Sequence, residues 1–221
     1  DRLLRLSDEA QAAVREGAPR GVLRIGTMES TAAARLPPIL AAYHAAWPQV
    51  RIELVTGTSA ALAEQVRGYA IEAAFVARPF PAQGLAAMDA FREELALISP
   101  AAWEPVGRAQ ELSGRSVIAF AAGCSYRRIL ESWLNQEGVT PANVMEFASY
   151  HAIVACVAAG SGVAIVPRSV LEVLGPAHSV RIGALPGSHA RALTQLVWRA
   201  DDDTPALQAL RQALQQAAQK R

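Results

Sequence analysis

The sequence predicts an α/β protein built from two lobes, in each of which helices cover a sheet. Short apolar runs alternate with segments whose apolar residues recur every three or four positions, an order typical of a parallel, helix-covered sheet. This order occurs twice, in units of about 90 residues each, and a final strand and helix follow. The 221 residues suffice for two units with separate cores.

The first unit begins with a short apolar strand and a loop, Thr27–Thr31. The next segment has apolar residues on one helical face, with Pro37 and Pro38 in its first turn and Pro48 after its end. The expected strands are 22–26, 50–54 and 71–77, and the expected helices are 36–47 and 62–68.

The second unit and the C-terminal segment continue this alternation. The expected strands are 91–99, 117–120, 144–147, 163–166 and 193–198, and the expected helices are 125–137 and 149–159. Thr204 followed by Pro205 is typical of an N-cap with proline at the first helical position, so we expect a last helix there.

The start of the chain has a different pattern. Leu3, Leu6, Ala10 and Ala13 form a short heptad seam. Two interpretations remain open: the end of a longer helix that packs on a partner, or an amphipathic helix that packs on its own domain.

Composition and charge exclude several classes of protein. Hydrophobic residues make up 52% of the chain, and 21 basic against 20 acidic residues leave a net charge of +1, which argues against disorder and against a nucleic-acid surface. Cys124 and Cys156 have no metal-ligand spacing, and their number favours a reducing compartment. Without a visible signal peptide or membrane span, we expect a cytoplasmic protein with no metal and no cofactor.

Several motifs resemble those of one family. The segments Gly21–Gly26, Leu36–Leu40 and Trp47–Val50, followed by Val157–Pro167 with its Gly160-Ser161-Gly162, resemble the effector-binding domain of LysR-type transcriptional regulators. Glu72 stands where that family usually has Asp. The resemblance covers residues 21–221, and its specificity comes from the order and spacing of the motifs.

The resemblance implies two Rossmann-like lobes joined by crossover strands, like the type 2 periplasmic-binding proteins. It places lobe I at residues 19–98 and 194–221 and lobe II at 99–193, with crossing segments near Leu95–Pro100 and Ala192–Leu196. Residues 1–18 resemble the end of the linker helix that follows the family's winged helix-turn-helix, so DNA binding is expected only through that N-terminal domain. The family also implies homodimers or homotetramers, with the helix Leu36–Trp47 at the contact.

A small effector is expected between the lobes. Ligands bind at the carboxyl ends of parallel strands, where helices begin and offer backbone N–H groups that favour anions. We therefore expect an at least partly anionic metabolite. The candidate binding residues follow three strands, with Arg78 at the end of a fourth: Thr27, Glu29, Ser30, Thr31, Arg78, Cys124, Ser125, Tyr126, Ser149, Tyr150 and His151.

Each candidate also has an ordinary structural interpretation. Ser30, Ser125 and Ser149 stand where serines cap helices without touching a ligand. Arg78 and Arg127 suit ion pairs. Glu29 is unexpected in an anion site, and it suits either pairing with an arginine or selection of an amine or hydroxyl group. A lone histidine such as His151 is also compatible with a structural role.

Three alternative functions are a redox sensor, a small enzyme and a solute receptor. Cys124, at a helix start beside Arg127 and Arg128, is expected to have a lowered thiol pKa, which would suit a redox sensor. A Cys124–His151 pair would suit a small α/β enzyme, although enzyme motifs are otherwise lacking and we expect no catalysis. A solute receptor of a transporter would share the same fold. We favour the regulator.

Overall fold

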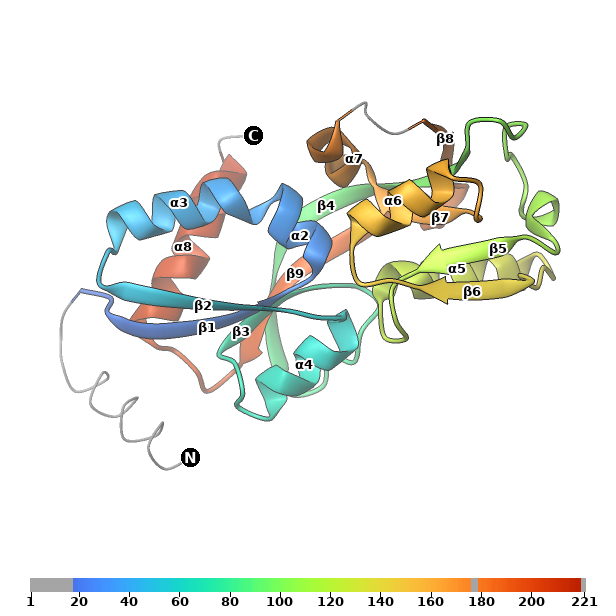
Figure 1. Ribbon diagram of the computed structural model, residues 1–221. Coiled ribbons are helices and arrows are strands. Elements are labelled where there is room, and N and C mark those ends of the chain that lie inside the picture. The colour runs from blue at the N-terminus through green and yellow to red at the C-terminus, as the bar shows by residue number, and fades with distance from the viewer. Residues whose placement is uncertain (1–17, 176–178, 220–221) are drawn as a thin grey trace.

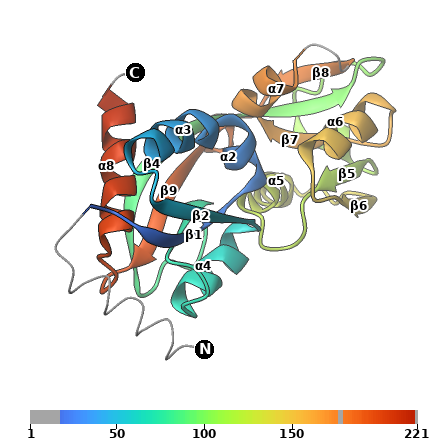
Figure 2. The same ribbon diagram turned by 60° about the vertical axis from the view of Figure 1, so that its left-hand side comes forward.

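The computed structural model describes residues 18–175 and 179–219, so the heptad predicted in residues 1–16 lies outside the described residues. The described chain forms two parts that lie side by side in Figures 1 and 2. The strands are β1 (Gly21–Thr27), β2 (Val50–Thr56), β3 (Ala73–Ala77), β4 (Leu85–Pro100), β5 (Ser116–Ala119), β6 (Asn143–Glu146), β7 (Ala164–Pro167), β8 (Val180–Ala184) and β9 (Arg191–Arg199). The α-helices are α2 (Glu29–Ala34), α3 (Leu36–Ala46), α4 (Ser59–Arg67), α5 (Ser125–Gln136), α6 (Tyr150–Ala158), α7 (Arg168–Leu174) and α8 (Pro205–Gln219).

Most strands belong to one continuous sheet in the order β2-β1-β3-β9-β4-β7, with β8 also paired to β4. The pairs of β1 with β2 and β3 are parallel, while β9 runs antiparallel to both β3 and β4. Strands β5 and β6 form a separate parallel pair. We call β1–β3, α2–α4 and α8 the first half, and β5–β8 and α5–α7 the second half.

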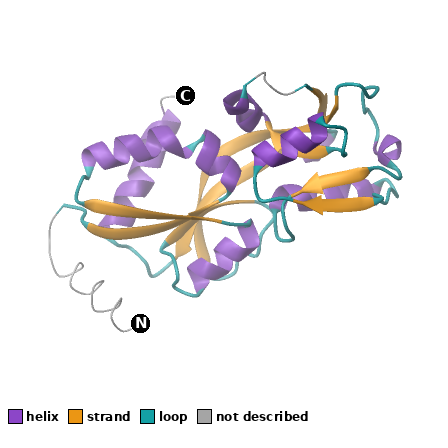
Figure 3. Ribbon diagram, viewed as in Figure 1, coloured by secondary structure: helices purple, strands orange, loops and turns teal. Residues whose placement is uncertain are grey.

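The 16-residue strand β4 serves both halves. Its residues 85–94 pair with β9, whereas residues 95–100 pair with β7 and β8. The crossing segments expected near Leu95–Pro100 and Ala192–Leu196 lie within β4 and β9. Strand β9 lies between β3 and β4 in the sheet, and β4 continues into the second half. The halves are therefore joined by β4 and β9, which lie far apart in the sequence (Figure 3).

Each half has its own apolar core. In the first half, alternate residues of β3 face opposite helices: Ala73 and Phe75 pack in the cluster with α3 and α8, while Ala74 and Val76 pack with α4. This alternation makes a three-layer arrangement, with every residue of β3 buried. A third cluster, around β5, β7, α5 and α6, forms the core of the second half.

The structure corrects several expected elements. Thr27–Thr31 was expected to be a loop, but Thr27 ends β1 and Glu29 begins the short helix α2. Strand β4 begins at Leu85 rather than Phe91, and α7 and β8 were not predicted. These elements have short or weakly alternating apolar patterns, so their pairing partners determine them more than their local sequence. The start of α3 with its prolines and the N-cap at Thr204 are confirmed.

Candidate functional site

Three helix beginnings meet where the two halves face each other. Helix α2 of the first half starts at Glu29, while α5 and α6 of the second half follow the N-cap residues Cys124 and Ser149. The N-cap residues of these three helices make no side-chain cap hydrogen bond. Of the three serines expected at cap positions, only Ser149 is an N-cap residue, whereas Ser30 lies within α2 and Ser125 is the first residue of α5. Capping therefore explains none of them.

Glu29 links the two halves directly. Its Oε1 accepts a hydrogen bond of 3.4 Å from the backbone N–H of Tyr150, at the start of α6. Its Oε2 is buried and has no hydrogen-bond partner among the described residues. Burial raises the pKa of the Glu29 carboxyl, although the Tyr150 N–H and the nearby charge of His151 partly counteract that rise. A carboxylate from one half thus lies at a helix start of the other.

Buried hydroxyl groups surround this carboxylate. Ser30, Tyr126 and Thr194 are at most 4% exposed, and within the described part of the chain none of their hydroxyl oxygens has a partner in good hydrogen-bonding geometry. They are nevertheless close together, because the Ser30 and Thr194 hydroxyls act on the Tyr126 hydroxyl to lower its pKa, against a larger rise caused by burial. Tyr150 is buried as well, and Ser30 and Glu29 act on its hydroxyl, whose pKa burial also raises. We call Glu29, Ser30, Tyr126, Tyr150 and Thr194 the boundary cluster.

The space beside the two tyrosines is small. Tyr126 and Tyr150 line a cavity of about 10 Å³, and the Tyr150 ring packs on Phe120 with 4.8 Å between ring centroids. Such a volume holds about one water molecule. All the residues that line this cavity belong to the second half, so it lies inside that half and not between the two halves.

Other predicted binding residues have partners of their own. The Ser125 hydroxyl lies 2.5 Å from the Ala77 carbonyl oxygen and 3.0 Å from that of Pro79, so it joins the start of α5 to the end of β3. The Thr27 hydroxyl donates to the Met28 carbonyl at 3.0 Å. Thr31 is buried within α2. Ser149 is half-buried and His151 is exposed.

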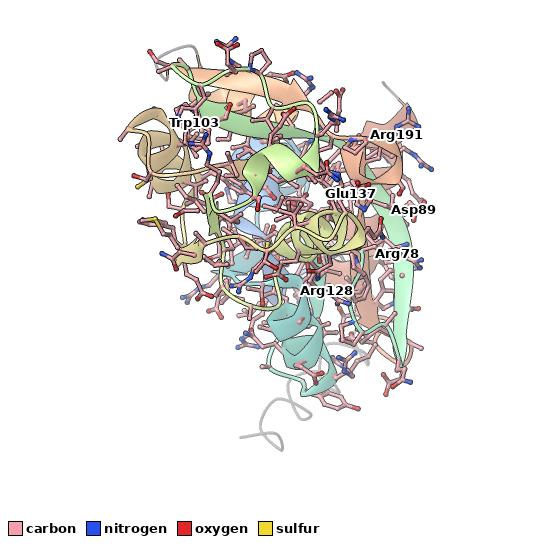
Figure 4. All side chains as sticks on the ribbon, turned by 90° about the vertical axis from the view of Figure 1, so that its right-hand side faces the viewer. Arg78, Asp89, Trp103, Arg128, Glu137 and Arg191 are labelled. Atoms are coloured by element: carbon pink, nitrogen blue, oxygen red, sulfur yellow. The ribbon has the colours of Figure 1, made fainter. Side chains whose placement is uncertain are left out.

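The arginines considered for an anionic ligand also have partners. Arg78 is exposed, and its Nε donates at 3.0 Å to Gln195, which in turn donates to Asp89; Figure 4 shows Arg78 and Asp89 near each other. Arg127 forms ion pairs with Glu131 and Glu146. The structure thus supports the ion-pair interpretation of Arg127, and Arg78 bonds a neutral amide.

Cys124 differs from its expected behaviour. It is the N-cap residue of α5, as predicted, but its thiol pKa is raised rather than lowered. Burial is the largest cause, and it outweighs the backbone N–H groups of Arg127 and Tyr126 and the charge of Arg127. This correction removes the basis for a reactive thiolate, and His151 is not among the groups described as acting on it.

A second buried polar group near the boundary between the halves was not predicted from the sequence. Glu93, on β4 and 5% exposed, accepts hydrogen bonds from Arg35 Nε at 2.7 Å and Nη2 at 2.9 Å, and from the Ser169 hydroxyl of α7 at 2.7 Å. We call Arg35, Glu93 and Ser169 the carboxylate network. Glu93 stands between Arg92 and Glu94 in the sequence, and no local signal shows that it is the buried one of the three. Thr194 gave no signal, because a threonine is common in any strand.

The described residues contain no group of three or more His, Cys, Asp or Glu side chains that could hold a metal ion. None of the helices described is both long and apolar enough to cross a membrane.

Comparison with known proteins relates the chain to one protein family. Residues 16–219 match the model of the LysR substrate binding domain. The HTH-type transcriptional regulator GltR of Bacillus subtilis (strain 168) is 35% identical over 211 residues, which are 95% of this chain and 71% of GltR. The HTH-type transcriptional regulator SoxR of Arthrobacter sp. (strain TE1826) is 36% identical over 183 residues, 83% of this chain but 62% of SoxR.

Solved structures share the fold. The effector binding domain of QuiR in complex with shikimate has a TM-score of 0.76 at 13% identity, over 91% of this chain and 99% of that one. The effector binding domain of a BenM variant has a TM-score of 0.75 at 20% identity, over 90% of this chain and 95% of that one. These matches confirm the predicted type 2 periplasmic-binding-protein-like fold.

Proposed function

Because the chain belongs to the LysR-type family of transcriptional regulators, as their substrate-binding part, we propose that its small effector binds at the boundary cluster. The observation that carries this proposal is the set of buried polar atoms without partners, Glu29 Oε2 and the hydroxyls of Ser30, Tyr126 and Thr194. Leaving such atoms unpaired costs about 1–3 kcal/mol each. These atoms come from both halves, and a ligand that forms hydrogen bonds with them would offset this cost.

The proposed mechanism is a shift between two arrangements of the halves. We propose lobe I at residues 19–98 and 194–221 and lobe II at 99–193. An effector that bonds Glu29 and Ser30 in one lobe and Tyr126 in the other favours one interlobe arrangement through its differential affinity. The relative positions of the lobes then control transcription through a winged helix-turn-helix N-terminal to the linker helix. The protein acts in the cytoplasm, and it has no catalytic role.

A dimer completes the proposal. Two chains side by side and antiparallel would place lobe I of one against lobe II of the other. Leu54 and Val55 on the edge strand β2 are 41% and 39% exposed, and Val173 of α7 and Ile182 of β8 are 59% and 48% exposed. Exposed apolar side chains on both lobes suit such a contact, and α3 adds an outer face of prolines and alanines.

The site proposal is tested by a metabolite screen with thermal-shift detection, followed by calorimetry on each hit. We expect a hit whose affinity falls at least about tenfold in Ser30→Val, which removes a hydroxyl of the cluster. The control is Ser161→Val, an exposed serine in the loop after α6. Hits that bind both variants and the parent chain equally would refute the site.

The dimer proposal is tested by sedimentation. Val173→Glu is expected to raise the monomer fraction at micromolar concentration, because it places a charge in the proposed apolar contact. Ala101→Glu, on an exposed turn, serves as the control. A parent chain that is already monomeric would contradict the proposal.

A further inference from the structure

Resting on the proposed function, we infer that the effector carries a primary amine whose ammonium group is held by Glu29, Ser30 and Tyr126. This assigns a chemical class to the ligand, and it differs from the anionic class that the helix beginnings alone suggest.

The first reason is the inventory of acceptors. Glu29 Oε2, Ser30 Oγ and the Tyr126 hydroxyl oxygen are all buried, and none has a partner in good hydrogen-bonding geometry among residues 18–175 and 179–219. They belong to one cluster, because Ser30 acts on the hydroxyls of both Tyr126 and Tyr150, and Glu29 acts on Tyr150. A primary ammonium group has three donors and no acceptor, so it matches three oxygen atoms. A carboxylate ligand brings only acceptors and would leave Glu29 Oε2 unpaired.

The second reason is charge. Glu29 introduces a negative charge in a half-buried position, where an interaction between charges is stronger than in open solvent. The neighbouring arginines do not neutralise it: Arg35 bonds Glu93, and Arg127 bonds Glu131 and Glu146. The exposed His151 supplies the only described cationic influence on Glu29. A cationic ligand would supply the missing partner, whereas an anionic ligand would be repelled.

The third reason is that the beginning of α6 is already occupied by one of the protein's own groups. The Tyr150 N–H at the start of this helix donates to Glu29. An anionic ligand would therefore have to displace Glu29 from α6, while an ammonium group needs only the atoms that lack partners.

The test is calorimetric titration with matched pairs of small probes that differ only in their charged nitrogen. The pairs are butylamine with butan-1-ol, 1,4-diaminobutane with 4-amino-1-butanol, and 4-aminobutyrate with 4-hydroxybutyrate; butyrate serves as the purely anionic probe. We expect at least one member with the extra amine to bind about tenfold or more tightly than its hydroxyl counterpart, because charge-assisted hydrogen bonds are the stronger ones.

Variants assign this preference to a residue. Glu29→Gln is expected to remove the preference for the amine, and Glu29→Asp is expected to restore part of it, since the negative charge returns. Glu104→Gln, at an exposed glutamate for which the structure describes no ion pair, is expected to retain it. Circular dichroism of each variant verifies that the fold is intact.

Three outcomes would overturn the inference. These are butyrate binding more tightly than every amine, an amine preference that survives in Glu29→Gln, and no preference in any pair. None of them refutes the proposed function, which fails only if hits of the metabolite screen ignore Ser30. A crystal structure with an ordered water alone between Glu29, Ser30 and Tyr126 at saturating amine would likewise exclude the ammonium site.

Discussion

The carboxylate network and the boundary cluster both contain a glutamate at the junction of the halves, but their hydrogen bonding differs. Glu93 is fully engaged by Arg35 and Ser169. Glu29 uses one oxygen for the Tyr150 N–H, and its other oxygen and three nearby hydroxyls have no well-placed partner in the part of the chain that the structure describes. A completed network is typical of a structural role, whereas buried unpaired atoms require another explanation, such as an absent ligand or water. The comparison separates the carboxylate network, which joins the halves, from the boundary cluster, where we propose that the effector binds.

The largest expected effect comes from breaking the carboxylate network. Glu93→Gln removes the charge that pairs with Arg35, and we expect a loss of about 3 kcal/mol in the free energy of unfolding, since breaking a buried ion pair leaves the other charge without its partner. Chemical denaturation measures it. The adjacent Glu94→Gln is the control: Glu94 is 61% exposed and pairs with Arg168, so its loss is expected to stay below about 1 kcal/mol. Equal losses in the two variants would contradict the assignment.

The next largest effect compares two serines. Ser169→Ala deletes a hydroxyl that donates to a buried carboxylate, for an expected loss of about 1.5 kcal/mol. Ser30→Ala deletes a buried hydroxyl that lacks a good partner among the described residues, so it removes the cost of burying that group and is expected to raise the free energy of unfolding by about 1 kcal/mol. Urea denaturation of both variants makes the comparison. A Ser30 variant that loses as much as the Ser169 variant would show that the boundary cluster is already satisfied.

A smaller effect is expected for Glu29→Gln. The folded chain raises the pKa of Glu29, so the folded state binds more protons than the unfolded state between the ordinary pKa and the raised one, and stability falls as pH rises through that interval. The variant avoids this cost and keeps an oxygen for the Tyr150 N–H. We expect its melting temperature at pH 7 to be higher by less than about 3 °C. The advantage should vanish below the ordinary carboxyl pKa; a constant advantage at all pH values would argue against it.

The smallest effect concerns Cys124. Because burial raises the pKa of its thiol, alkylation by iodoacetamide at pH 8 is expected to be several times slower in the folded chain than in the chain unfolded by guanidinium chloride. Mass spectrometry of the peptide with Cys124 measures both rates. Faster alkylation in the folded chain would restore the reactive thiolate that the sequence suggested.

The sequence predicted the alternating strands and helices well, because local periodicity and proline positions report on them directly. The start of α3 and the N-cap Thr204 are examples. It did not predict α7, β8 or the early start of β4, whose partners lie far along the chain. Tertiary pairing decides such segments.

The candidate site was predicted in position more than in chemistry. Glu29, Ser30, Tyr126 and Tyr150 were named as neighbours, and the structure places them in one cluster. Their burial could not be foreseen, because the sequence does not reveal how closely the halves approach. Cys124 shows the consequence of this burial. Its position at a helix start was expected to lower the pKa of its thiol, but desolvation raises that pKa. The ion pair of Arg127 with Glu131 follows a local i,i+4 helix spacing, whereas its second partner, Glu146, lies too far along the chain for a local pattern to show it.

The position of β9 in the middle of the sheet has a consequence for synthesis. As the nascent chain leaves the ribosome, β1, β2 and β3 emerge early, yet the neighbour that β3 requires emerges only with residues 191–199. Until then, β3 and the beginning of β4 present unpaired backbone edges of the kind that invite association with other chains. The strands β5, β6 and β7 emerge together and can assemble first, so the segment nearest the N-terminus is the last to complete its fold.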